Sequence, residues 1–178
     1  MTSQLRVDKI VPVDGAPSGG GGGIVQVVSN TFTGTWSGSS GSGNFDNIDD
    51  LNTSITPKFN TSKIFIMVYI GQWDSNGTNQ RGGLRLMRDS TAICIGDAAS
   101  NRTRSSASAV GSNSNTDTNG GIHIHFMDSP ATTSAVTYKV QSQTEGSYTT
   151  YINRSSADAD SSSVQRCAST VTLMEISA

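Results

Sequence analysis

The chain of 178 residues is long enough for one domain with a hydrophobic core, but hardly for two. Hydrophobic residues make up 34% and charged residues 15%, and the net charge is -2, so the chain lacks the cationic character that binding to nucleic acid or to an anionic membrane requires. The chain contains neither the roughly 20 consecutive apolar residues of a membrane span nor the N-terminal apolar run of a signal peptide. We therefore expect synthesis in a cytoplasm, a thin core and no membrane partner.

The first 23 residues are predicted to form an extended arm ahead of the domain. They hold a short alternating apolar stretch and two prolines, and they end in five consecutive glycines. A run of glycines is flexible because it has no side chains to restrict the backbone, which predicts a hinge at Gly19, Gly20, Gly21, Gly22 and Gly23. The apolar side chains of the arm are candidates for docking on a neighbour, and they are Leu5, Val7, Ile10, Val11 and Val13.

From residue 24 to residue 178 the sequence predicts one all-β domain. Short segments with alternating or continuous β-type residues recur between clusters of Gly, Asn, Asp and Ser, and no long window shows an amphipathic helical stripe. This spacing is typical of a single β-sandwich or jelly roll. The expected strands are Ile24–Ser29, Thr31–Trp36, Leu51–Thr56, Lys63–Ile70, Gly83–Met87, Ala92–Ile95, Ile122–Met127, Val136–Gln141, Thr149–Asn153 and Ser169–Ile176.

Two local patterns make the prediction more specific. Lys63–Ile70 is apolar at nearly every position, so we expect it in the interior of a sheet. Arg88–Thr91 has the composition of a tight turn and predicts a hairpin between its flanking strands.

No catalytic motif is present, and we expect neither enzymatic activity nor a cofactor. Cys94 and Cys167 lie in β-type segments with no metal-site or disulfide spacing, which favours buried free thiols. His123 and His125 share one face of a strand and could contribute to a metal site, but no third ligand is evident in the sequence. The alternative is a strand whose polar face carries both histidines.

Two other groups of residues suggest binding. Trp36 and Trp73 could stack on a sugar, although in a chain with 6% aromatic residues such side chains more often anchor the core or an interface. Arginines concentrate in the middle of the chain, where they could contact an acidic partner or form a solvated face; they are Arg81, Arg85, Arg88, Arg102 and Arg104.

Five segments carry a resemblance to a known family: Leu5–Gly15, Thr61–Ile64, Met127–Pro130, Tyr148–Arg154 and Thr170–Ile176. Together they resemble small structural proteins of tailed bacteriophages, particularly those of marine bacteria. The order of strands is also similar to trimeric jelly rolls of the C1q and tumour-necrosis-factor type. In those jelly rolls three sandwiches pack around a three-fold axis, with the first and last strands paired on an inner sheet.

The resemblance implies a virion structural protein, either a tail-fibre piece or a head decoration, that forms a homotrimer and docks on other virion proteins through its arm. In such a trimer the apolar strand residues divide between the core and the three-fold contact, and they are Phe65, Met67, Tyr69, Val171, Leu173 and Ile176. The alternative hypothesis is a carbohydrate-binding module that recognises a host surface glycan, with Trp36, Trp73 and the loop 98–120 at its rim.

Overall fold

The structure is a computed structural model of the chain, and it describes residues 23–77, 80–110 and 120–177. The predicted docking residues of the arm (Leu5, Val7, Ile10, Val11 and Val13) and the hinge residues Gly19 to Gly22 lie outside these ranges. Gly23 lies within them. Its carbonyl oxygen accepts hydrogen bonds from the backbone N–H and the hydroxyl of Ser177, at 3.0 and 3.3 Å. The start of the described chain is thus tied to its end.

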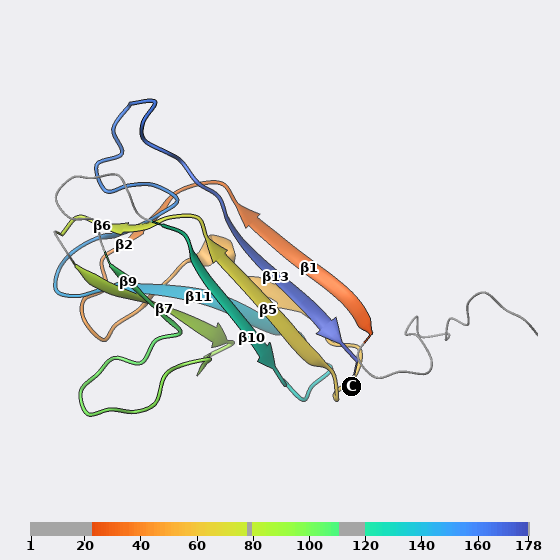
Figure 1. The fold of residues 1–178 in the computed structure, drawn as a ribbon. Helices are drawn as coiled ribbons and strands as arrows, with labels where there is room; N and C mark the ends of the chain where they lie inside the picture. Colours follow the sequence, from red (N-terminus) through yellow and green to blue (C-terminus); the bar gives the residue numbers. More distant parts are fainter. Residues whose placement is uncertain (1–22, 78–79, 111–119, 178) are drawn as a thin grey trace, which may run out of the picture.

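The first sheet is antiparallel and has the strand order β1-β13-β5-β10 (Figure 1). The strands are β1 (Ile24–Phe32), β13 (Ser169–Ile176), β5 (Lys63–Ile70) and β10 (Ile122–Asp128). The first and last described strands pair along their whole length, from Ile24 opposite Ile176 to Phe32 opposite Ser169. β5 lies between β13 and β10, which confirms that it is an interior strand.

The second sheet has the order β3-β11-β7-β8, with β4 also pairing with β11 and β9 with β7. Its strands are β3 (Asp46–Asn47), β4 (Thr53–Ile55), β7 (Arg81–Arg88), β8 (Thr91–Ile93), β9 (Ala107–Val110) and β11 (Val136–Thr144). A small third sheet has the order β2-β12-β6. It contains β2 (Trp36–Gly38), β12 (Thr150–Ile152) and β6 (Trp73–Ser75).

The core lies between the first two sheets. Alternate residues of β5, including Ile64 and Ile66, are fully buried, as are Leu84 and Leu86 of β7 and Tyr138 of β11. This alternation is expected where each sheet covers the core with one face. The chain is therefore an all-β sandwich of the jelly-roll kind, as the sequence predicts.

Several boundaries differ from the prediction. β1 runs through Asn30 without a break, although a break was predicted there. The side-chain amide of Asn30 donates to the carbonyl oxygens of Asp50 and Asn52, at 2.8 and 3.4 Å, so its hydrogen bonds are satisfied within the strand. Asp49–Leu51 forms a short 3-10 helix before β4, and β9 lies within residues 98–120, which were expected to form a loop. Among the described residues no helix is long and apolar enough to cross a membrane.

The two cysteines are free, as expected, but only half-buried. The expected burial is only partial because both lie in loops beside the sheets: Cys94 follows β8, and Cys167 precedes β13. Burial raises the pKa of the Cys94 thiol above its usual value, so this thiol is less reactive than a fully exposed thiol.

Candidate assembly surface

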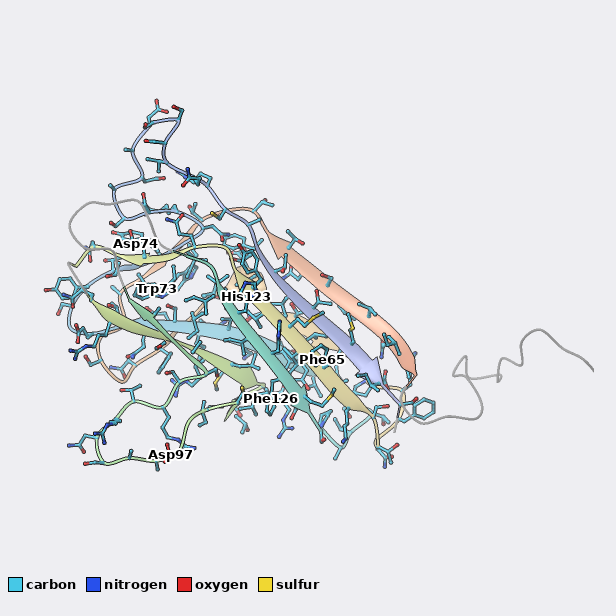
Figure 2. The ribbon with its side chains drawn as sticks, in the orientation of Figure 1. Phe65, Trp73, Asp74, Asp97, His123 and Phe126 are labelled. Carbon is cyan, nitrogen blue, oxygen red and sulfur yellow. The ribbon has the colours of Figure 1, made fainter. Side chains whose placement is uncertain are left out.

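The outer face of the first sheet presents cross-strand rows of side chains that point away from the core. The pairing register defines three such rows, each with one residue from each strand. Phe65 and His123 lie on neighbouring strands of this face (Figure 2). The first row is Val27, Met174, Phe65 and Met127; the second is Ser29, Thr172, Met67 and His125; the third is Thr31, Thr170, Tyr69 and His123.

These rows contain no Asp, Glu, Lys or Arg. The first row is entirely apolar, and two of its side chains stand well out into solvent: Val27 is 53% exposed and Met127 is 43% exposed. In the third row Tyr69 is 37% exposed. An antiparallel sheet with one solvated face normally carries polar and charged residues on that face, and a contiguous exposed apolar patch marks an interaction site. The outer face therefore has the chemistry of an interface.

The residues predicted to divide between the core and the trimer contact lie on two different faces of the first sheet. Val171 and Leu173 of β13 are buried in the core, whereas Phe65, Met67 and Tyr69 of β5 lie on the outer face. Ile176 is half-buried opposite Lys63, at the end of the sheet. Participation of the outer-face residues in a three-fold contact stays a prediction.

The two histidines lie side by side on β10, with ring centroids 6.3 Å apart. His123 stacks on Tyr69 at 4.7 Å, and His125 lies 6.1 Å from the ring of Phe65. Both are exposed, while Ile122, Ile124 and Phe126 point toward the core, as expected for a strand with one polar face. No third His, Cys, Asp or Glu joins them among the described residues.

The position of β10, and hence of the outer face, is fixed by a buried polar group at its end. Asp128 is 6% exposed and accepts hydrogen bonds from Arg88 of β7, at 2.9 and 3.1 Å, and from the hydroxyl of Tyr138 of β11, at 2.7 Å. Burial raises the pKa of Tyr138 far above its usual value, and the hydrogen bond to Asp128 and its charge raise it further. Tyr138 is therefore a permanent donor that ties the first sheet to the second.

Of the two alternatives for Trp73, the structure confirms the core anchor and contradicts the glycan contact. Its side chain is 1% exposed, and its indole N–H donates to the Ser142 hydroxyl of β11 at 2.9 Å. A buried indole needs such a partner; because Ser142 provides it, the ring belongs to the core and offers no face to a sugar. Trp36 is half-buried and packs against the core.

Sequence reasoning missed Val27, Met127 and Met174 as outer-face residues. They come from three segments far apart in the sequence, and only the register of the four strands brings them into one row with Phe65. Lys63–Ile70 is apolar at nearly every position, so its sequence does not show which of its side chains form this face.

Comparison with protein-family models gives no match, and neither does comparison with curated proteins. Among solved structures, the chain is similar to the infectious bursal disease virus VP2 subviral particle, with 9% sequence identity and a TM-score of 0.39. The similarity covers 97% of this chain and 44% of that chain, so this chain spans less than half the length of that protein. A likeness at this level carries no argument about function.

Proposed function

We propose that the chain is a virion structural protein of a tailed bacteriophage, which forms a homotrimer through the outer face of its first sheet and docks on the particle through its N-terminal arm. The three uncharged rows of that face, of which the first is entirely apolar and partly exposed, carry the proposal. Removing such side chains from water stabilises an assembly by about 25 cal/mol for each Å² of apolar surface buried. A chain with only 34% hydrophobic residues has a lean core, so burial at an interface adds stability that the isolated fold lacks.

The three-fold arrangement and the virion role have separate support. The pairing of β1 with β13 next to β5 and β10 is the arrangement expected on the inner sheet of a C1q-type or tumour-necrosis-factor-type trimer. The segments that resemble bacteriophage structural proteins support a tail-fibre piece or a head decoration. In this proposal the protein acts by holding a position in the particle, and it has no catalytic role.

The mass of the purified protein in solution tests the assembly. We expect three times the chain mass of 18.6 kDa by light scattering. Met127→Lys should return the monomer mass, because it places a charge in the apolar row that would have to be desolvated on assembly. Thr91→Lys is the matched control, since Thr91 is an exposed strand residue of the second sheet. A stable monomer of the unmodified chain at micromolar concentration would contradict the proposal.

Removal of residues 1–18 tests the docking role separately. The shortened chain should keep its trimer mass, because the outer face is intact, and should be absent from purified particles. If the shortened chain were found on particles in normal amounts, docking through the arm would be wrong even if the trimer were right.

A further inference from the structure

A hollow of about 420 Å³ lies on the second sheet, beside the loop that joins β8 to β9. We call it the arginine-lined hollow. The loop extends away from the sheets (Figure 1), and Arg85 forms part of the wall from β7. The residues of interest in the lining are Arg85, Ser100, Asn101, Arg102, Thr103 and Arg104.

The three guanidinium groups of this hollow have no carboxylate partner among the described residues. The lining contains no Asp or Glu, and the ion pairs of the described chain involve other arginines. Arg102 and Arg104 donate to the backbone carbonyl oxygens of Ala99 and Gly96, at 3.4 and 2.6 Å. Asp97 belongs to the same loop (Figure 2) but does not line the hollow. Positive charge is therefore concentrated here without an internal counterion.

Arg85 is held in a way that prepares it for an anion. Its guanidinium lies over the ring of Phe45, 3.7 Å from the centroid. Its Nε is buried and has no hydrogen-bond partner, and neither has Oε1 of Gln141, which lies opposite Arg85 on β11. Burial lowers the pKa of Arg85 from its usual value. A partly desolvated cation gains more from a bound anion than a fully solvated one does.

The remaining lining indicates the kind of anion. Ser100, Asn101 and Thr103 make no side-chain hydrogen bond within the described chain, so their hydroxyl and amide groups are free to bind. Guanidinium groups bind carboxylates through paired hydrogen bonds, and free hydroxyl and amide groups match the hydroxyls of a sugar ring.

We infer that the arginine-lined hollow binds an acidic saccharide, with the sugar carboxylate held by the arginines and the ring hydroxyls held by Asn101 and Thr103. This inference is independent of the proposed assembly, because the hollow lies on the second sheet and the assembly surface on the first. It gives the chain a place to contact an acidic surface glycan that does not involve the buried Trp73.

Calorimetric titration of the full chain with tri-galacturonate tests the inference, with the methyl ester of the same trisaccharide as the neutral ligand. We expect binding of the acid and at least about tenfold weaker binding of the ester, the loss typical of a missing charged hydrogen-bonded pair. Arg102→Gln combined with Arg104→Gln should weaken binding of the acid by about tenfold or more. Lys58→Gln removes one exposed cation from a turn outside the hollow and should leave the affinity unchanged.

Two further titrations separate a saccharide from other carboxylates. Asn101→Ala combined with Thr103→Val should weaken binding of tri-galacturonate and leave the weak binding of acetate unchanged. If a peptide of three glutamates binds as tightly as the saccharide, or if acetate binding falls equally in that variant, the saccharide class is wrong. If tri-galacturonate does not bind, or if Lys58→Gln weakens it as much as the arginine variant does, the site itself is wrong. Thermal unfolding of each variant confirms that the fold is kept.

Discussion

Asn153 connects three parts of the chain at one end of the sandwich. It is fully buried, and its φ of 64° lies in the left-handed region, which Asn tolerates better than most residues. Its amide donates to the carbonyl oxygens of Phe32 and Gly34, at 3.0 and 2.9 Å, and its side-chain oxygen accepts from the Ser169 hydroxyl at 2.6 Å. The end of β1 and the start of β13 therefore both depend on this one side chain.

Substitution Asn153→Asp should lower the free energy of unfolding by about 2–4 kcal/mol, because it removes the donor to two carbonyl oxygens and places a carboxylate against them in a buried site. Urea unfolding at neutral pH measures the loss. Asn60→Asp, in an exposed turn, is the control and should change stability by less than about 0.5 kcal/mol. Equal stability of the two variants would show that Asn153 is not the connection described.

Glu175 makes the stability depend on pH. It is fully buried; burial would raise its pKa, but hydrogen bonds from Gln26 at 2.5 Å and from the backbone N–H groups of Lys58 and Phe59, at 2.7 and 3.3 Å, outweigh this and hold the pKa below its usual value. A folded-state pKa below the unfolded value of about 4.3 gives stability that is present above that pH and is lost as the pH falls through the folded-state pKa.

Glu175→Gln should therefore destabilise the fold by about 1–3 kcal/mol at pH 7, and by less near pH 3. A glutamine at position 175 has one oxygen that can accept, so its NH₂ group would face either the backbone N–H groups or the NH₂ group of Gln26. Gln26 cannot rotate its amide to present its oxygen instead, because its NH₂ group also donates to the carbonyl oxygen of Thr56 at 2.7 Å. Denaturant unfolding at several pH values checks this. Asp97→Asn, in an exposed loop, is the control. A loss for Glu175→Gln that stays constant with pH would contradict the assigned role.

At the scale of the elements, the start of β7 is shaped by a side chain from β6. A Cβ at Gly82 would overlap ring carbon Cζ2 of Trp73 and would also lie 2.7 Å from the carbonyl oxygen of Gln143. Gly82→Ala should thus cost about 1–3 kcal/mol by overpacking. Gly96→Ala is the matched control, since a Cβ there meets no atom within 4 Å, and it should leave stability unchanged or slightly raised. Thermal unfolding of the two variants compares them directly.

The long strands and the tight turn could be predicted from the sequence, whereas several short strands could not. The long strands β5 and β13 were predicted at their observed bounds, because each is a continuous β-type run between turn residues. The Asp89 turn was also found from its composition, and its φ of 52° suits a tight hairpin. The strands of two to four residues were predicted unevenly, because so short a run rarely shows periodicity. Predicted segments overlap most of β4, β8 and β12, but they miss β3, β6 and β9.

The outer face of the first sheet could be predicted only where the signal lies within one segment of the sequence. The apolar run Lys63–Ile70 indicated an interior strand, but it did not show which of its side chains face the core; the structure places Phe65, Met67 and Tyr69 on the outer face. The first row of the outer face depends on registers between segments separated by many residues, and a single sequence does not contain them. The sequence left the role of Trp73 open for a related reason: its partner Ser142 lies on a distant strand.

At the scale of the whole molecule, two surfaces of opposite chemistry lie on different sheets. The rows of the outer face carry no Asp, Glu, Lys or Arg, whereas the arginine-lined hollow gathers three guanidinium groups without a carboxylate. Salt screens interactions between exposed charges but has little effect on apolar burial. The proposed trimer contact and the proposed glycan contact should therefore respond differently to ionic strength.

We expect the trimer mass to be the same from about 0.05 M to about 0.5 M NaCl, a range over which the Debye length shortens several-fold, while the affinity for tri-galacturonate falls steadily. The trimer should also show an unfolding temperature that rises with protein concentration, because dissociation accompanies unfolding. Met127→Lys should abolish that concentration dependence and leave tri-galacturonate binding intact. Arg102→Gln combined with Arg104→Gln should weaken tri-galacturonate binding and leave the concentration dependence intact. Loss of both properties in either variant would mean that the two surfaces are coupled and that the glycan contact depends on assembly.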